Sequence, residues 1–165
     1  MTERQRPALA YIGLGSNLEA PRDQLERALS ALGSLPLSEC VARSSLYTSA
    51  PVGPQDQPDF INAVAAIRTR LSPLALLDQL QALEQRHRRV RNRHWGPRTL
   101  DLDLLWYAGL ERHSPRLTLP HPQMRHRRFV LEPLAEIAPT LSIDGQSPLT
   151  LAARLSDQTL TRLTP

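Results

Sequence analysis

Apolar residues recur along this chain with two different spacings, and the order of these spacings restricts the fold more than any other feature. Short apolar or alternating runs, typical of β-strands, occur at residues 9–14, 38–48, 60–67 and 100–107. Leucine and alanine recur three or four positions apart at residues 21–32 and 73–87, which is the spacing of amphipathic helices. The resulting βαββαβ order predicts an α+β, ferredoxin-like sandwich, an antiparallel sheet with two helices on one face.

Local signals refine this prediction. Gly33 predicts the end of the first helix, and Ser72 followed by Pro73 predicts an N-cap and first turn. Beyond the last strand we expect C-terminal additions: a short segment around residues 117–119, a helix near 127–137 and a polar end. Because 165 residues suffice for one hydrophobic core, we expect a single domain over residues 1–165, with its core at about 8–140.

All 20 basic residues are arginines, and the absence of lysine excludes two chemistries. A Walker A phosphate loop and a Schiff base both require lysine. The net charge of +4 favours an anionic partner, and composition leaves open whether this is a phosphate-bearing ligand or nucleic acid. The chain has no run of about 18 apolar residues and its start lacks the apolar region of a signal peptide, so we expect a soluble cytoplasmic protein without a membrane partner. The single cysteine, Cys40, is expected to be a small buried residue.

Asp101 and Asp103 are the strongest candidates for chemistry. Side chains at positions i and i+2 of a strand leave the same face, with Cα atoms about 6.5 Å apart, so the two carboxylates can share a metal ion. Hard oxygen ligands suit Mg²⁺, which proteins commonly hold with one or two carboxylates plus substrate phosphates. By itself, however, this pattern fits two solvated acids on an exposed strand at least as well.

An arginine-rich segment lies directly before this acidic pair. Six arginines and two histidines occur between Arg86 and Arg98. Guanidinium groups bind phosphate oxygens in pairs and neutralise the charge of phosphoryl transfer, so arginines beside two aspartates favour a nucleoside triphosphate. For Arg86, Arg88 and Arg93, a solvated basic helix end remains an alternative.

Two further patterns remain ambiguous. Gly13 and Gly15 follow a strand but lack the third glycine of a dinucleotide fingerprint, so we interpret residues 15–17 as a tight turn. The long proline-rich loop at residues 50–58 is typical of a functional loop. Phe60 and Asn62, next along the chain, share one strand face where a ring and an amide could bind a heterocycle, although Phe60 also fits a core residue.

Four ordered segments resemble the 6-hydroxymethyl-7,8-dihydropterin pyrophosphokinase family of folate biosynthesis. They are Tyr11–Leu18, Pro54–Asn62, the block Trp-Gly-Pro-Arg-Thr-Leu-Asp-Leu-Asp at 95–103, and residues 119–131, which begin Leu-Pro-His-Pro and end Arg-Arg-Phe-Val-Leu. The resemblance runs from about residue 9 to 140 and fades after about 144. It implies the ferredoxin-like fold and an ATP-dependent diphosphotransferase that moves pyrophosphate to the pterin's hydroxymethyl group, giving the pterin diphosphate and AMP.

The resemblance also implies roles for individual residues. Asp101 and Asp103 would hold two Mg²⁺ ions, while Arg89 and Arg98 would act on the phosphates during transfer. The pterin would be bound by Ser49, Val52, Gly53, Phe60, Asn62, Trp95 and Phe129, with its ring between the two phenylalanines. ATP would be bound by Gln81, Glu84, Arg91, Trp95, Arg98, Arg116, Thr118, His121 and Arg127.

Two other classes of function compete with this kinase. A basic stripe on a ferredoxin-like sheet also suits RNA binding, but aromatic residues make up only 4% of the chain and no strand is rich in Phe or Tyr. An inactive relative that serves as an interaction protein is the third class, yet all residues expected for metal and phosphate are present. We therefore expect a monomer that binds ATP and a reduced pterin, and no nucleic acid.

Overall fold

The predicted βαββαβ order is confirmed in the computed structural model, which describes residues 6–17, 20–50, 59–90 and 100–164, the side chains of residues 88–90 excepted. The strands are β1 (Ala8–Ser16), β2 (Ser38–Arg43), β3 (Tyr47–Ser49), β4 (Phe60–Thr69), β5 (Leu100–Tyr107), β6 (Arg112–His113), β7 (Thr118–Leu119) and β8 (Leu160–Arg162). The helices are α1 (Pro21–Gly33), α2 (Pro73–Val90), α3 (Arg128–Ile137) and α4 (Pro148–Ala153), with a short 3₁₀ helix, η2, at Met124–His126.

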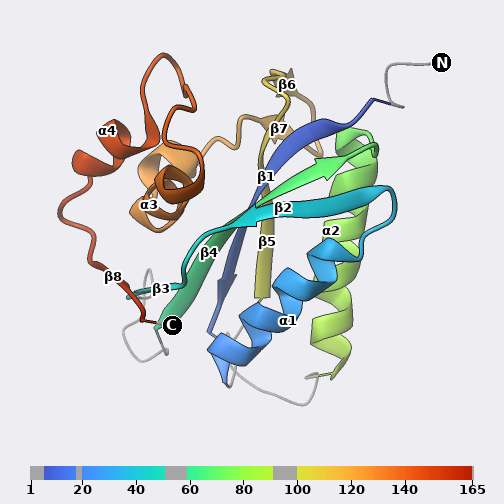
Figure 1. Ribbon diagram of the computed structural model, residues 1–165, viewed down its shortest axis with the longest axis horizontal. Helices are drawn as coiled ribbons and strands as arrows, with labels where there is room; N and C mark the ends of the chain where they lie inside the picture. The colour runs from blue at the N-terminus through green and yellow to red at the C-terminus, as the bar shows by residue number, and fades with distance from the viewer. Residues whose placement is uncertain (1–5, 18–19, 51–58, 91–99, 165) are drawn as a thin grey trace.

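The main sheet is antiparallel, with strand order β5-β1-β4-β3-β8 and β2 also paired to β4. Helices α1 and α2 cover one face, here called the helical face (Figure 1). Most of their predicted apolar residues are buried there: Leu25, Ala28, Leu29 and Leu32 from α1, and Leu76, Leu77, Leu80 and Leu83 from α2. Leu74, also predicted for this face of α2, is half-buried and packs against the same core. The helix start is also as predicted, because the Ser72 hydroxyl accepts a hydrogen bond from the N–H of Ala75 at 3.2 Å. The ferredoxin-like fold is thus confirmed.

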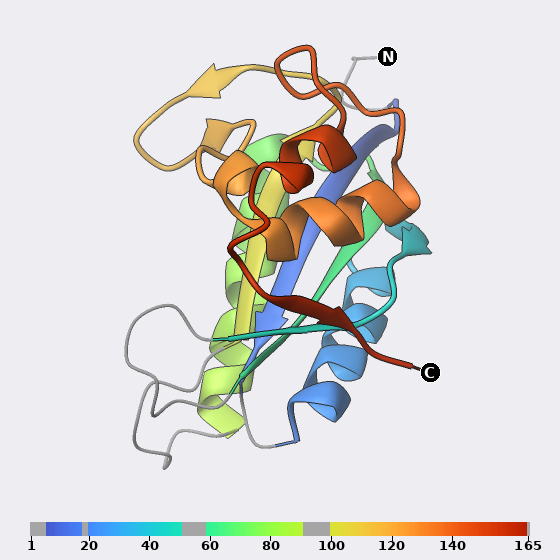
Figure 2. The ribbon, with the colours of Figure 1, turned by 90° about the vertical axis from the view of Figure 1, so that its left-hand side faces the viewer.

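The opposite face of the sheet, here called the open face, has a second core at one end. Helix α3, predicted near residues 127–137, packs Val130, Leu131 and Leu134 against Val64 and Leu105 of the sheet. Figure 2 shows α3 and the C-terminal segment crossing this face. The other end of the open face carries polar and aromatic side chains instead of a helix-covered core.

Two local expectations were wrong or incomplete, and one was confirmed. The strand predicted at 38–48 is divided into β2 and β3, because the register shifts between Cys40 and Ala42 and the N–H of Ser45 donates to the Glu136 carboxylate instead of to a strand. The predicted end of the first helix at Gly33 is confirmed, since Gly33 is the last residue of α1. Cys40 is half-buried and packs against the helical-face core, where it is a free thiol.

The C-terminal segment is more ordered than its polar composition predicts. Ser147 caps α4 by accepting a hydrogen bond from the N–H of Thr150, and β8 then adds to the sheet beside β3. The chain end therefore returns to the open face. Among the helices that the structure describes, none has the length and apolar character needed to cross a membrane.

Candidate active site

Strand register places the two aspartates beside two glycines on the open face. Asp103 lies opposite Gly13, and Asp101 lies opposite Gly15. Gly15 in turn lies opposite Asn62 on β4. The predicted alternation of β5 is confirmed, since Leu100, Leu102 and Leu104 are buried on the helical face while Asp101 is exposed and Asp103 is half-buried.

The glycines belong to this face and not to a tight turn, which corrects the sequence interpretation. Both Gly13 and Gly15 are inside β1. A Cβ atom on Gly15 would lie 3.3 Å from Oδ1 of Asn62 and 3.8 Å from the Phe60 ring. A side chain there would therefore fill the space between Asp101 and Asn62, so the glycine keeps this part of the face open.

A cavity of about 700 Å³ lies over this part of the face. Seven residues predicted for the site line it: Ser49, Phe60, Asn62, Asp101, Asp103, Arg127 and Phe129. The cavity has the size of small-molecule sites in proteins, about 300–1,000 Å³. The structure thus brings the predicted metal ligands and four of the predicted pterin-binding residues into one cavity.

The aromatic and amide groups of the cavity come from β4 and the first turn of α3. Phe60 begins β4, Phe129 is the second residue of α3, and both rings are half-buried. Asn62 is only 2% exposed, and its Nδ2 donates a hydrogen bond to the Ser49 hydroxyl at 2.8 Å. Ser49 therefore holds the amide in one orientation. Phe60, for which a core position was the alternative, lines the cavity.

Arg127, the residue before α3, places positive charge beside Asp103, and His121 lies close to the same carboxylate. A guanidinium nitrogen of Arg127 is 3.8 Å from the Asp103 carboxylate, and the same group lies 5.8 Å from the centre of the Phe129 ring. Burial lowers the pKa of His121. The charge of Asp103 acts to raise this pKa and the charge of Arg127 lowers it further, and the net shift is downward. Nδ1 of His121 accepts a hydrogen bond from the N–H of Gln123 at 3.1 Å. A neutral His121 therefore carries its proton on Nε2 and can donate it to an anion.

The predicted ATP-binding residues of α2 and of the segment before η2 gather along the edge of β5. Glu84 accepts a hydrogen bond from the N–H of Leu102 at 2.7 Å, and the N–H of His121 donates to the carbonyl of Leu105 at 2.8 Å. Arg116 lies between the paired strands β6 and β7 and donates a hydrogen bond to Gln81 at 3.1 Å. Thr118 lies in β7. The predicted ATP-binding residues along this edge therefore extend from α2 to His121, which lies close to the charges of Asp103 and Arg127.

Asp78 of α2 also contacts the residues along this edge, and the sequence analysis did not predict it. It accepts a hydrogen bond from Arg116 at 2.7 Å. Its position three residues before Gln81 on α2 was the available signal, because residues at i and i+3 share a helix face.

The cavity also contains C-terminal residues that no sequence pattern indicated. Asp157, Gln158 and Thr159 line it. The Gln158 amide donates to the carbonyl of His126 and accepts from the N–H of Arg128, both at 2.9 Å. Gln158 thereby holds the backbone on both sides of Arg127.

Several predicted residues lie outside the described residues: Val52, Gly53, Arg91, Trp95, Arg98 and the side chain of Arg89. Their assignments remain predictions from the resemblance.

The carboxylate pair on β5 fits Mg²⁺. In the part of the chain with described coordinates, no three His, Cys, Asp or Glu side chains are grouped to hold a metal ion. A site built on Asp101 and Asp103 therefore provides two carboxylates, the number that Mg²⁺ commonly takes from a protein when substrate phosphates supply further oxygens.

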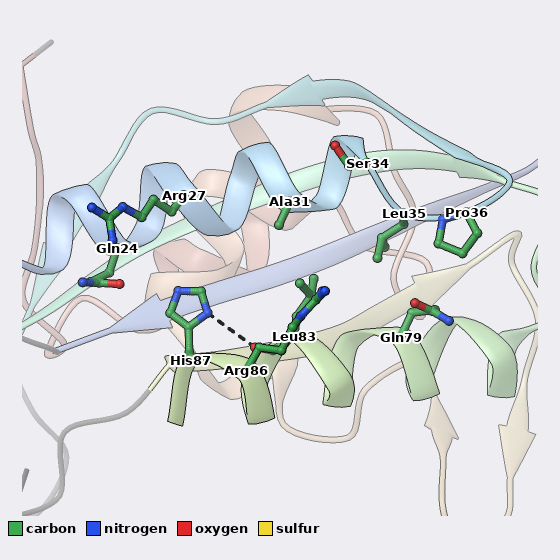
Figure 3. Close-up of a pocket in the computed structure, with 10 residues that line it drawn as sticks. All are labelled: Gln24, Arg27, Ala31, Ser34, Leu35, Pro36, Gln79, Leu83, Arg86 and His87. Atoms are coloured by element: carbon green, nitrogen blue, oxygen red, sulfur yellow. Dashed lines mark hydrogen bonds between the residues drawn. The ribbon is translucent and has the colours of Figure 1, made fainter. Parts of the chain in front are cut away.

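A second cavity, of about 440 Å³, lies between α1 and α2 on the helical side of the sheet (Figure 3). None of the residues predicted for the site lines it.

Comparisons with known proteins identify the family of this chain. Residues 11–139 match the family model described as 7,8-dihydro-6-hydroxymethylpterin-pyrophosphokinase (HPPK). A Haemophilus influenzae protein named 2-amino-4-hydroxy-6-hydroxymethyldihydropteridine pyrophosphokinase is 50% identical over 157 residues, which cover 94% of this chain and 98% of that protein. A Pseudomonas aeruginosa protein of the same name is 53% identical over 137 residues, 82% of this chain and 85% of that protein.

Solved structures show the same fold. A crystal structure of a triple mutant of Plasmodium falciparum HPPK-DHPS with STZ-DHP superimposes with a TM-score of 0.72 and 13% sequence identity. The match covers 90% of this chain and 43% of that chain, so this chain spans less than half of the longer protein.

Proposed function

Since the chain belongs to the 7,8-dihydro-6-hydroxymethylpterin-pyrophosphokinase family, and so is a pyrophosphokinase of folate biosynthesis, we propose that the open-face cavity is its active site. There the enzyme transfers pyrophosphate from ATP to 6-hydroxymethyl-7,8-dihydropterin. The observation that carries this proposal is the presence of Asp101, Asp103, Phe60 and Phe129 around one cavity.

The aromatic end of the cavity suits the pterin. Phe60 and Phe129 offer two ring faces from different elements, and a flat heterocycle gains both apolar burial and stacking between such rings. The Asn62 amide, oriented by Ser49, can pair with donors and acceptors on the edge of the heterocycle. In this proposal the hydroxymethyl group lies toward the carboxylates of β5, which line the same cavity.

The edge of β5 suits ATP. Arg116 and Gln81 lie at its outer end, while His121 and Arg127 lie beside Asp103. A triphosphate along this edge would meet the Nε2–H of His121 and the guanidinium of Arg127, which stabilise negative charge without any proton transfer. His121 therefore acts as a phosphate contact, not as a general base.

Asp101 and Asp103 are the residues that would hold Mg²⁺, two ions by the family resemblance. Bound there, Mg²⁺ would neutralise phosphate charge and make the pterin hydroxyl easier to deprotonate. The hydroxymethyl oxygen forms a bond to the β-phosphorus, the bond from that phosphorus to the oxygen of the α-phosphate breaks, and AMP leaves. The proton of the hydroxyl passes to a nearby carboxylate or to water. A guanidinium nitrogen of Arg127 is 3.8 Å from the Asp103 carboxylate, so Arg127 can balance the negative charge of Asp103 or of a phosphate.

We also propose that the enzyme acts as a cytoplasmic monomer on these two small molecules, with no nucleic acid partner. A cavity of about 700 Å³ with an aromatic end supports small-molecule substrates.

Product identification tests the function. The purified protein is incubated with ATP, Mg²⁺ and the reduced pterin alcohol, and the nucleotide and pterin products are separated by chromatography. The proposal predicts AMP and the pterin diphosphate in equal amounts, and neither product after chelation of Mg²⁺. ADP with a pterin monophosphate, or loss of ATP without a pterin product, would contradict it.

A further inference from the structure

The groove between α1 and α2 contains an amide that has no hydrogen-bond partner among the described residues. Gln24 on α1 is only 6% exposed and lines the groove. Among the described residues, no hydrogen bond to its side chain is present. Its amide atoms are not among the unpaired polar atoms that are closed to solvent, so they face the open groove, where a ligand can reach them. Figure 3 shows the Gln24 side chain directed toward His87 of α2, across the groove.

The groove also carries uncompensated positive charge. Arg27 on α1 and Arg86 on α2 line it, and both side chains are exposed. Within the described segments neither arginine has an acidic partner, whereas Arg43 and Arg116 elsewhere on the surface are paired with Glu26 and Asp78. No aspartate or glutamate is among the residues that line the groove. An anion bound here would therefore meet two guanidinium groups and no repelling charge.

The wall of the groove is apolar. Leu35, which follows α1, is 5% exposed, and Leu83 of α2 is 4% exposed, and both border the groove. Its volume of about 440 Å³ is within the range of small-molecule sites. An occupant thus needs an apolar body for this wall and an anionic head for the arginines.

We propose that this groove is a second ligand site, which binds a small amphipathic anion: a compound with one anionic group on an apolar ring system. The arginines bind the anionic group, the Gln24 amide completes its hydrogen bonds, and the ring packs on Leu35 and Leu83. The site is independent of the proposed active site, because it lies on the helical side of the sheet and shares no lining residue with the open-face cavity.

Titration of the ¹⁵N-labelled protein with 2-naphthoate, followed by NMR, tests the proposal. The expected result is saturable shifts of the amide signals of residues 24–36 and 79–87. The neutral analogue 2-naphthamide and inorganic phosphate alone should each bind about tenfold or more weakly, because one lacks the charge and the other lacks the apolar body. Shifts confined to the residues around Phe60 and Phe129 would assign the probe to the open-face cavity and overturn the proposal. Absence of shifts at millimolar 2-naphthoate would also overturn it.

Variants give the second test. Arg27→Gln and Arg86→Gln should each weaken 2-naphthoate binding about tenfold, while Arg154→Gln, an exposed arginine at the end of α4, should leave it unchanged. Gln24→Leu should also weaken binding but preserve the fold, because it replaces an unpaired amide with an apolar group of similar size. Equal affinities of all four variants and the unmodified protein would show that the groove does not recognise the anion.

Discussion

The carboxylate of Glu84 accepts a hydrogen bond from the backbone N–H of Leu102, the residue between the two aspartates of β5, at 2.7 Å. Among the described strands, β5 pairs with β1 only, so its other edge needs partners from outside the sheet. Glu84 supplies one of them, and the backbone of His121 supplies another through Leu105. Glu84, which was predicted to bind ATP, therefore also stabilises the strand that carries Asp101 and Asp103.

Glu84→Ala should lower both the stability of the fold and the rate of catalysis. The buried N–H of Leu102 would lose its charged acceptor, which destabilises by about 1–3 kcal/mol in urea unfolding. Glu84→Gln keeps an oxygen acceptor and should recover most of this stability. If Glu84→Ala unfolds at the same urea concentration as the unmodified protein, the hydrogen bond to Leu102 has no structural role.

Phe60→Ala and Phe129→Ala should raise the KM for the pterin much more than the KM for ATP. Each removes one ring face from the cavity, a loss of about 1–3 kcal/mol of burial and stacking, or roughly tenfold to a hundredfold in KM. Steady-state kinetics with each substrate varied in turn measures the difference. Phe60→Tyr is the matched control, since it keeps the ring and should change the KM for the pterin little. Equal effects on both substrates would contradict placement of the pterin between these rings.

Glu136 of α3 contacts residues at β3 and β8, and its charge should make the stability of the fold depend on pH. Its carboxylate accepts hydrogen bonds from the N–H and hydroxyl of Ser45 and from the hydroxyl of Tyr47 at 2.7 Å, with Arg162 at 3.4 Å. Burial acts to raise the pKa of Glu136, but these hydrogen bonds and Arg162 outweigh it and lower the pKa below the ordinary value of 4.5. Burial and the hydrogen bond to Glu136 raise the pKa of Tyr47.

Glu136→Gln should therefore destabilise the protein at neutral pH by about 1–3 kcal/mol, and by less in acid. A carboxylate with a lowered folded-state pKa contributes its stability above the unfolded value of 4.5 and loses it as the pH falls through the folded value. Urea unfolding of both proteins at pH 7 and at a series of values below 4.5 measures the gap. A gap of constant size across this range would refute the role of the charge.

Much of the fold could be predicted because each core element has a clear apolar spacing. The helices over residues 21–32 and 73–87 and the strands over 60–67 and 100–107 all formed within a few residues of their expected bounds. Strand β8 could not be predicted, since it has three residues of which two are exposed, and its pairing with β3 is set by tertiary contacts. Helix α4 did have a signal, Ser147 followed by Pro148, but it is only six residues long.

The candidate site was predictable where side chains alternate along one strand. The i and i+2 positions of Asp101 and Asp103, and of Phe60 and Asn62, fixed which residues share a face. The glycines were misread because a Gly-x-Gly pattern gives no sign of what lies across the sheet, here Asn62 and the aspartates. Gln158 was missed because its role depends on a contact with residues about 30 positions away.

The open-face carboxylates of β5 carry the reaction in the proposed mechanism, and turnover of single aspartate variants tests this role most directly. Asp101→Asn and Asp103→Asn keep the shape of each side chain but remove the charge that a phosphate-bound Mg²⁺ requires, so kcat should fall about 10³-fold or more. Because Asp101 is exposed and Asp103 half-buried, both variants should fold normally. Asp157→Asn removes a carboxylate that lines the same cavity from the C-terminal segment, and it should stay within about threefold of the unmodified enzyme. AMP formation by the Asp101 and Asp103 variants at a rate near that of the unmodified enzyme would contradict the account.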